Sequence, residues 1–259
     1  MTLITDPIFY IAAIPAVTFL GVSRGGFSGV GLLATPLLAI VLPPLQAAAI
    51  LLPILLLQDI ISVAAYRHDW DAGNLKTMLP GAAVGIGAAW ALAAHVGDAV
   101  VRLAIGATAL GFVFHSWLAR PTVQLKRPSV PHGVFWGSIS GFTSTLCQAG
   151  GPPFQIYVMP QRLEKLTFVG TMAIFFAVVN VAKVVPYFTL GQFSTAGLAT
   201  SIALVPIAVV TNFLGIWLVR ITPTVLFYRL SYVLMFVISL ALIYSGLRDV
   251  IVDGPPFVR

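Results

Sequence analysis

The sequence predicts an all-α integral membrane protein with about eight transmembrane segments in two four-segment repeats. Of its 259 residues, 59% are hydrophobic and 8% are charged, whereas a soluble domain carries about 25% charged residues. The mean hydropathy is +0.99, and several apolar stretches reach the roughly 20 residues that a helix needs to cross the hydrocarbon core. We therefore expect a protein whose outer surface faces a lipid bilayer.

Two apolar stretches, at about 8–42 and 133–159, form the first segment of each repeat and are interrupted. The first contains GVSRGGFSGVG at 21–31, and the second contains GFTSTLCQAGG at 141–151. One helix over 8–42 would be roughly 50 Å long, well beyond the hydrocarbon thickness. Each stretch is therefore expected to be broken, either as two half-helices that cross in series or as a helix with a re-entrant return.

Six uninterrupted apolar spans complete the count. They are expected at about 45–66, 76–94, 98–118, 166–188, 194–218 and 223–247. The longest polar connection, RPTVQLKRPSVPH at 120–132, is rich in proline and basic residues. It divides the chain into a first membrane repeat at 1–120, a linker at 121–132 and a second membrane repeat at 133–259.

Each repeat consists of a broken segment followed by three ordinary spans. At an offset of 120 or 121 residues, these pairs align: Gly21 with Gly141, Ser23 with Thr143, Gly31 with Gly151, Asp59 with Asn180, and Tyr66 with Tyr187. If every segment crosses the membrane, the two repeats have the same orientation. If the broken segments are re-entrant, each repeat makes three crossings and the repeats are inverted.

The basic residues are scattered among short loops, although the net charge is +6. Nucleic-acid binding needs a clustered basic face, so nucleic acid is not an expected partner. If all segments cross, seven Lys and Arg residues lie on one side and five on the other. The positive-inside bias then places both termini in the cytoplasm. The oligomeric state is left open.

The two breaks are the expected substrate site. Non-helical backbone is tolerated at membrane depth only where it is buried in protein or lines a watery cavity, and matching breaks in two halves point to a transporter's substrate site. Glycines allow successive N–H groups to face an anion, while hydroxyl and amide groups replace its hydration shell. The candidates are Ser23, Arg24, Gly25, Gly26, Ser28, Gly29 and Gly31, then Thr143, Ser144, Thr145, Gln148, Gly150 and Gly151. The alternative is that the hydroxyls bond their own backbone or promote tight packing.

Arg24 is the only charged residue of the first broken segment, and a guanidinium at membrane depth needs a partner. A bound oxyanion is one such partner, and a carboxylate such as Asp59 is another. In a third arrangement, the side chain snorkels to an interface.

Further polar residues lie inside two ordinary spans. They are Gln58, Asp59 and Ser62 in span 45–66, and Asn180 and Lys183 in span 166–188. Charged groups inside a membrane are functional candidates by default, so we assign these residues to coupling or gating. The alternative is that Asp59 and Lys183 pair with each other and serve only folding. Asn212 in span 194–218 is a lesser candidate. The GxxxG spacings at 21–25, 81–85 and 137–141 indicate close helix packing.

Three segments, GVSRGGFSGVGLLATPLL at 21–38, GFTSTLCQAGGPPFQIYV at 141–158 and VGTMAIFFAVVNVAKV at 169–184, carry a family resemblance. With them the chain resembles the sulfite exporter TauE/SafE family of membrane permeases. The resemblance implies a plasma-membrane carrier, without a cofactor, for sulfite, sulfonates or related small sulfur-containing anions. Pro152 follows Gly151 where Leu32 follows Gly31, so the two halves need not contribute equally.

The leading hypothesis is a secondary transporter, an exporter or permease, that binds a small anion between the two breaks. A proton or another ion is the candidate coupling partner, because the chain has no nucleotide-binding motif. One alternative is an intramembrane serine hydrolase, since GFSG at 26–29 matches the G-x-S-G string of rhomboid-type proteases and would make Ser28 the nucleophile. A nucleophilic serine needs a base within about 3 Å, and every histidine falls near a span end. A passive anion channel is the other alternative.

Overall fold

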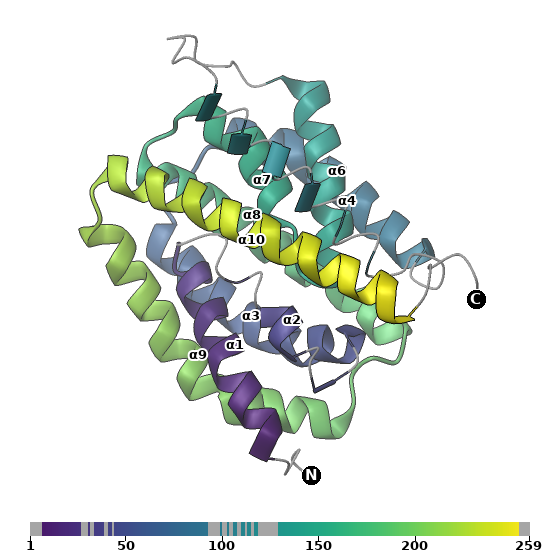
Figure 1. Ribbon diagram of the computed structural model, residues 1–259. Coiled ribbons are helices and arrows are strands. Elements are labelled where there is room, and N and C mark those ends of the chain that lie inside the picture. Colours follow the sequence, from purple (N-terminus) through teal and green to yellow (C-terminus); the bar gives the residue numbers. More distant parts are fainter. Residues whose placement is uncertain are drawn as a thin grey trace.

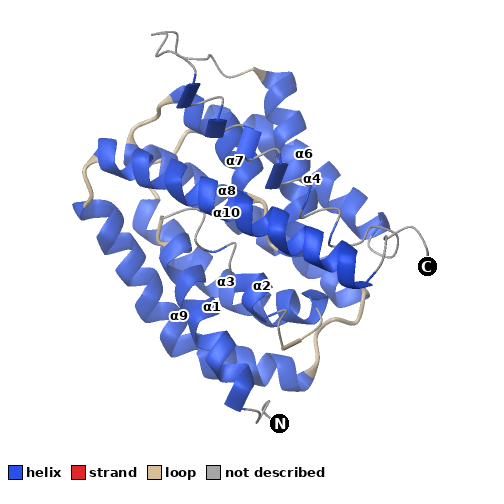
Figure 2. Ribbon diagram, viewed as in Figure 1, coloured by secondary structure: helices blue, strands red, loops and turns tan. Residues whose placement is uncertain are grey.

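The structure is a computed structural model that describes residues 7–26, 31, 34–38, 41–42, 44–92 and 129–253, with a few positions between 99 and 118. These residues form helices joined by loops, and no strand occurs among them (Figure 2). The first half contains α1 (Pro7–Arg24), α2 (Ala34–Leu38), α3 (Pro44–Tyr66) and α4 (Ala72–Leu92). The second half contains α6 (Val130–Cys147), α7 (Gly151–Val158), the 3-10 turn η2 (Met159–Gln161), α8 (Lys165–Thr189), α9 (Thr195–Ile221) and α10 (Thr224–Asp253).

Among the described residues, five helices are long and apolar enough to cross a membrane: α1, α3 from Gln46, α4, α8 and α9. The spans predicted at 45–66, 76–94, 166–188, 194–218 and 223–247 correspond to α3, α4, α8, α9 and α10. Most of the span predicted at 98–118 lies outside the described residues. The described helices thus support the prediction of an all-α, multi-pass membrane protein.

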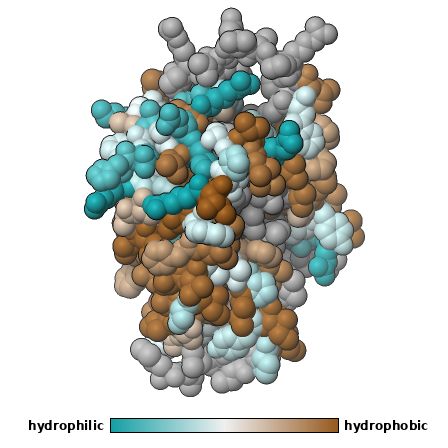
Figure 3. Space-filling view, turned by 90° about the vertical axis from the view of Figure 1, so that its left-hand side faces the viewer, coloured by the Kyte–Doolittle hydropathy of each residue, from teal (hydrophilic) through white to brown (hydrophobic). Residues whose placement is uncertain are grey.

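Large apolar side chains are exposed on the outside of these helices. On α9 they include Ile202, Val210 and Phe213, each more than half exposed. Figure 3 shows apolar residues over the middle and lower part of one face, with hydrophilic residues gathered toward one end. In water such a surface would aggregate, whereas hydrocarbon accepts it.

The helix ends follow from local chemistry. The Asp71 carboxylate accepts a 2.7 Å hydrogen bond from the N–H of Asn74 at the start of α4, and the Ser194 hydroxyl accepts one of 3.0 Å from Gly197 at the start of α9. Both are N-cap bonds to groups that have no partner within the helix. After α1, Gly26 takes a φ of +133°, a conformation that glycine reaches without strain.

The second break is a helix with a return. The Ser140 hydroxyl of α6 donates to the carbonyl of Gly150, just before α7, at 2.7 Å. At the other end of α7, the Tyr157 hydroxyl donates to the carbonyl of Ser129, just before α6, at 3.3 Å. Since the end of α7 lies beside the start of α6, the two helices are antiparallel. Of the two arrangements left open by the sequence, the re-entrant one therefore describes residues 133–159.

The first break also returns toward the start of α1. Phe9 near the start of α1 shares one apolar cluster with Leu38 at the end of α2. The side chains of Ser62 and Tyr66, in the last turns of α3, donate to the carbonyls of Arg24 and Gly25. Because α1 and α3 end side by side, the chain between them must come back, and two half-helices in series do not fit.

Helices α3 and α8 cross antiparallel at the centre of the molecule. Asp59 of α3 meets Asn180 of α8 by a hydrogen bond. On one side of this crossing, Leu52 packs with Tyr187, and on the other Tyr66 and Phe168 lie in one apolar cluster. The start of α3 therefore lies beside the end of α8, and the end of α3 beside the start of α8, so the two helices are antiparallel.

Glycines bring two further helix pairs into backbone contact. A β-carbon at Gly81 or Gly85 of α4 would overlap the backbone of α6, and one at Gly141 of α6 would overlap α4. Gly25, directly after α1, and Gly215 of α9 meet in the same way. In Figure 1, α1 and α9 accordingly run side by side. The prediction that the GxxxG spacings mark close helix packing is confirmed for all three.

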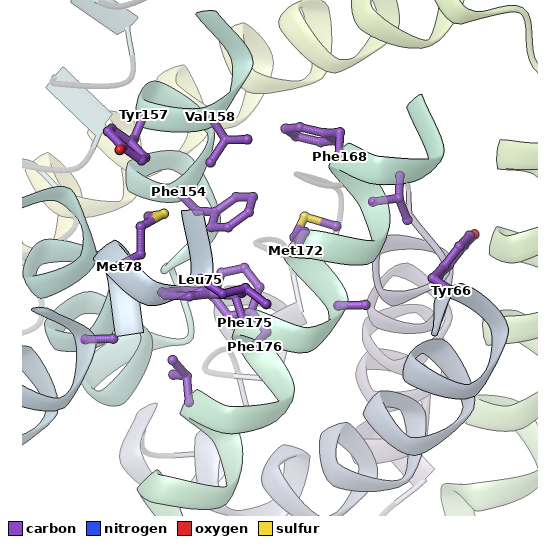
Figure 4. Close-up of a cluster of buried hydrophobic side chains, with 14 of the residues drawn as sticks. Tyr66, Leu75, Met78, Phe154, Tyr157, Val158, Phe168, Met172, Phe175 and Phe176 are labelled. Carbon is purple, nitrogen blue, oxygen red and sulfur yellow. The ribbon is translucent and has the colours of Figure 1, made fainter. Parts of the chain in front are cut away.

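An aromatic cluster holds the return helix α7 against α8. Phe154 of α7 lies with its ring centroid 5.2 Å from that of Phe175 and 5.8 Å from that of Phe176. Phe168 lies at 6.1 Å on the other side. Figure 4 shows these rings gathered around Phe154. Burial of aromatic rings stabilises the contact, so the position of α7 after the break is fixed by α8.

Candidate functional site

A cluster of polar and charged side chains lies where the two breaks meet the α3–α8 crossing. Its core residues Asp59, Asn180 and Lys183 are 0 to 2% exposed. Arg24 joins them from the end of α1, with a side chain that is 15% exposed. We call this group, together with Ser144 and Gln148 of the second break, the central polar cluster.

Arg24 pairs with Asp59. A guanidinium nitrogen lies 3.4 Å from the Asp59 carboxylate, and the guanidinium also stands 5.0 Å from the centre of the Phe176 ring. The second carboxylate oxygen of Asp59 accepts a hydrogen bond from the Asn180 amide. Of the three arrangements considered for Arg24, the structure therefore has the carboxylate partner, and the side chain does not snorkel to an interface.

Lys183 attaches the second break to α8. Its ammonium group donates to the Ser144 carbonyl at 3.1 Å, to the Ser144 hydroxyl at 3.0 Å and to the Gln148 side-chain oxygen at 2.6 Å. Gln148 itself has a φ of 57°, a left-handed conformation that is unfavourable for a residue with a β-carbon. Asp59 thus pairs with Arg24 of the first break, and Lys183 bonds to Ser144 and Gln148 of the second. The two residues are therefore not an isolated pair with each other.

The carbonyl groups that end α1 and α6 are held by matching side chains. The Tyr66 hydroxyl donates to Gly25 at 2.6 Å, and the Tyr187 hydroxyl donates to Thr145 at 2.8 Å. Carbonyls in the last turn of a helix lack partners within it. Each break is therefore fastened by a tyrosine from the next long helix of its own half.

Asn212 of α9 bonds to polar groups of α3 beside the first break. The Asn212 amide donates to the Gln58 carbonyl and to the Ser62 hydroxyl, both at 3.2 Å. The Gln58 amide in turn donates to the Ala208 carbonyl at 3.2 Å. These bonds fix the α3–α9 contact beside Arg24.

Several buried polar atoms in and beside the cluster have no hydrogen-bond partner among the described residues. They are Gln58 Oε1, Asp59 Oδ1, Gln148 Nε2 and Asn180 Oδ1. The contact of Asp59 Oδ1 with Arg24 is an ion pair by distance, without hydrogen-bond geometry. Leaving such a group unpaired costs about 1–3 kcal/mol, so each of these atoms calls for a partner outside the described residues, such as a water molecule or a ligand.

The predicted site residues differ in what the structure shows of them. Most lie in or beside the central polar cluster: Arg24, Gly25, Gln58, Asp59, Ser62, Ser144, Gln148, Gly150, Asn180 and Lys183. Gly26 follows Gly25 and lies against Val169 and Val219. The backbone at Gly31 lies against Ser23, and Gly151 begins α7. The Thr145 hydroxyl donates to a carbonyl of its own helix, and the Thr143 hydroxyl lies within hydrogen-bond distance of carbonyls of its own helix and of Ala149 in the break. Ser28 and Gly29 lie outside the described residues.

Some residues of the site were not predicted to contribute. The alignment of Tyr66 with Tyr187 was visible in the sequence, but their bonds to the breaks were not. Phe176, beneath Arg24, resembles any other apolar residue of its span. Gln155 and Thr35 stand in the two breaks' return helices and carried no signal beyond being polar in an apolar stretch. No group of three or more metal-ligating side chains occurs in the part of the chain that the structure describes.

A comparison with known families decides the class of protein. The sequence model of the family described as sulfite exporter TauE/SafE matches residues 13–242, nearly the whole chain. The chain belongs to this family. Its members are membrane transporters of sulfur anions, so the TauE/SafE protein described here is a multi-pass membrane transporter and not an enzyme. The serine hydrolase hypothesis for Ser28 is thereby wrong. Comparisons with curated proteins and with solved structures give no significant match.

Proposed function

We propose that this TauE/SafE protein is a secondary transporter, an exporter or permease, for a small sulfur anion such as sulfite or a sulfonate. The central polar cluster carries this proposal, because it joins both breaks to two buried cations and contains polar atoms that have no hydrogen-bond partner in the described part of the chain. An oxyanion offers several acceptor oxygens, which suit Arg24, Lys183 and the backbone N–H groups of the breaks.

Substrate binding would loosen the contact between Arg24 and Asp59. The guanidinium lies at 3.4 Å from the carboxylate without hydrogen-bond geometry, so an anion that approaches Arg24 competes with Asp59 for it. Asp59 can then accept a proton or another cation. In this proposal Gln58, Ser62 and Asn180 hold Asp59 and the first break in register, and Lys183 does so for the second.

We further propose that the chain consists of two inverted repeats, at 1–120 and 133–259, joined by the linker 121–132. The antiparallel crossing of α3 and α8 at Asp59 and Asn180 supports this, because these residues align with each other at the repeat offset. Two-fold symmetry about an axis in the membrane plane brings equivalent residues of antiparallel helices together. The matching bonds of Tyr66 and Tyr187 to their breaks also fit it.

The arrangement suits alternating access. The first long helix of each half packs on the third long helix of the other half. In this way α1 packs on α9, and α6 packs on α4. Rocking of one half against the other about the α3–α8 crossing would expose the cluster to each side in turn. An even number of crossings places both termini on one side, which we propose is the cytoplasmic side of the plasma membrane.

Transport by purified protein in liposomes tests the function. Sulfite, methanesulfonate, sulfate and acetate are offered across a pH gradient. We expect saturable uptake of a sulfur anion and counterflow, in which external substrate drives exit of labelled internal substrate. Flux that does not saturate and shows no counterflow would favour the passive channel. An absence of flux for all the sulfur anions would contradict the proposal.

A further inference from the structure

A buried glutamine beside the central polar cluster has no assigned role. Gln155 of α7 is 0% exposed, and neither atom of its side-chain amide has a hydrogen-bond partner among the described residues. Gln161 offers a contrast a few residues later. Its amide donates to Asn74 and accepts from Asn74, both at 2.9 Å. Among the described residues Gln155 therefore bears the cost of a buried polar group without the compensating bonds, which indicates a partner outside them, and a bound substrate is such a partner.

The Gln155 amide lies at the start of α7, next to the second break. Its nitrogen is 3.8 Å from the position that a β-carbon would take on Gly151, consistent with helical side chains that point toward the N-terminus. At the preceding Gly150, a β-carbon would lie 2.8 Å from both Ser144 and Phe176. Ser144 accepts a hydrogen bond from Lys183, and the Arg24 guanidinium lies over the Phe176 ring. The amide thus lies beside Gly151, and the preceding Gly150 lies against the two side chains that contact the cations.

The position of the first half that is equivalent to Gln155 also has a buried polar side chain without a described hydrogen-bond partner. An offset of 120 residues pairs Gln155 with Thr35 of α2. The Thr35 hydroxyl is buried and, among the described residues, likewise lacks a hydrogen-bond partner. Two return helices therefore present an unpaired polar side chain at matching positions.

The charges of the cluster set the charge of its ligand. Arg24 and Lys183 are positive and Asp59 is negative, so the ionised residues sum to one positive charge. A buried net charge is costly in a membrane, and one monoanion neutralises it. A dianion would leave the occupied site with an excess negative charge.

The unpaired atoms require a ligand that also donates. An amide has a donor nitrogen and an acceptor oxygen, and further unpaired acceptors occur on Gln58 and Asn180. A sulfonate or a fully ionised sulfite has acceptor oxygens only. Hydrogen sulfite in its hydroxyl form is a monoanion with both acceptors and one donor.

We propose that Gln155 contacts the substrate and that the site selects a protonated monoanion, hydrogen sulfite, over sulfonates and dianions. This inference rests on the proposed function. The Gln155 amide nitrogen donates to a sulfite oxygen, and its oxygen accepts from the sulfite hydroxyl. A site built to bond a hydroxyl rejects an analogue without it, because the site's own polar groups are then left unpaired.

The test compares sulfite with methanesulfinate, a monoanion in which a methyl group of similar size replaces the hydroxyl of hydrogen sulfite, and with methanesulfonate as the sulfonate. Affinities are measured for the purified full chain by ligand-induced shifts in thermal stability, in slightly acidic buffer where hydrogen sulfite predominates. We expect the wild type to prefer sulfite by at least about tenfold, the value of one buried hydrogen bond. Gln155→Met, which keeps the length without the amide, should abolish this preference.

Gln161→Met is the matched control. It breaks the reciprocal pair with Asn74, so it should lower thermal stability and leave the preference unchanged. Gln155→Met should leave stability unchanged or raise it. If Gln155→Met does not fold, Gln155→Asn decides, since it withdraws the amide by one methylene group and should also reduce the preference.

The outcomes separate this inference from the proposed function. Sulfite binding with the same preference in wild type and Gln155 variants overturns the inference and leaves the proposed function standing. A wild type that binds methanesulfinate or methanesulfonate with the same affinity as sulfite also overturns it. A wild type that neither binds nor transports any of the sulfur anions overturns both.

Discussion

The buried contact between Arg24 and Asp59 is the residue-scale feature on which transport most depends. Arg24→Gln removes the positive partner and leaves Asp59 as an uncompensated buried charge. Breaking such a pair costs about 3–5 kcal/mol. We expect Arg24→Gln to lose stability of this order in a thermal or chemical unfolding assay, and to lose sulfite transport in liposomes.

The double variant Arg24→Gln/Asp59→Asn separates folding from transport. With both charges removed, stability should return toward the wild-type value, because neutral amides at 24 and 59 can bond each other and Asn180. Transport should stay lost, because the anion has lost one of its two cations. Recovery of transport together with stability would mean that the pair serves folding alone.

Lys183 supplies the second cation of the cluster. Lys183→Met removes the ammonium that binds Ser144 and Gln148, and a hydrogen bond to a charged group contributes about 1.5–3 kcal/mol. We expect sulfite affinity, measured by thermal shift, to fall by at least about tenfold. The matched control is Lys165→Met. The Lys165 ammonium donates to the Thr222 carbonyl at 2.6 Å, after the end of α9, so this change should affect stability and leave affinity unaltered. Equal affinity losses in the two variants would contradict a role for Lys183 in binding.

At the scale of elements, the glycine contacts set how closely helices approach. Gly85 and Gly87 lie two residues apart on α4, but a β-carbon would overlap the Ser138 carbonyl of α6 at Gly85 and meet nothing within 4 Å at Gly87. Gly85→Ala should therefore force α4 from α6 at a cost of about 1–3 kcal/mol. Gly87→Ala should be neutral or stabilise by up to about 1 kcal/mol. Unfolding midpoints in detergent measure both, and equal effects would contradict the described packing.

The sequence predicted elements better than their connections. Hydropathy placed a span at 194–218 where α9 runs from Thr195 to Ile221, because the length of an apolar stretch determines whether it crosses the membrane. The glycine-rich strings located both breaks for a similar local reason. The direction of the chain after a break depends on distant contacts, such as Tyr157 with Ser129, which no local pattern encodes.

The candidate site was predictable in part for the same reason. Charges inside apolar spans stand out, so Asp59 and Lys183 were found, and the repeat offset linked Asp59 to Asn180. A threonine that bonds its own helix, such as Thr145, cannot be told by sequence from one that faces a ligand. Gln155 could be recognised only once its burial without partners was visible.

At the scale of the whole molecule, inverted repeats make a prediction about the two tyrosines. Tyr66 and Tyr187 fasten the first and second breaks through equivalent bonds, and an inverted arrangement assigns these breaks to opposite sides of the membrane. Tyr66→Phe and Tyr187→Phe each remove one hydrogen bond, a net loss of about 0.5–1.5 kcal/mol. They should therefore shift the balance between inward-open and outward-open states in opposite directions.

A cysteine placed at the second break reports this balance. Gly151 begins α7 directly after the break, and a β-carbon there meets nothing closer than 3.8 Å, so Gly151→Cys fits the fold. In a Gly151→Cys/Cys147→Ser parent, the labelling rate by a membrane-impermeant thiol reagent, applied to one side of oriented vesicles, depends on which side is open. We expect one tyrosine variant of this parent to label faster than the parent and the other to label more slowly. Tyr244→Phe is the control, since Tyr244 is 72% exposed on α10 and its loss should leave the rate unchanged. Rates that change in the same direction in both variants would mean that the breaks open together, as in a channel, and the rocking of two inverted halves would then be wrong.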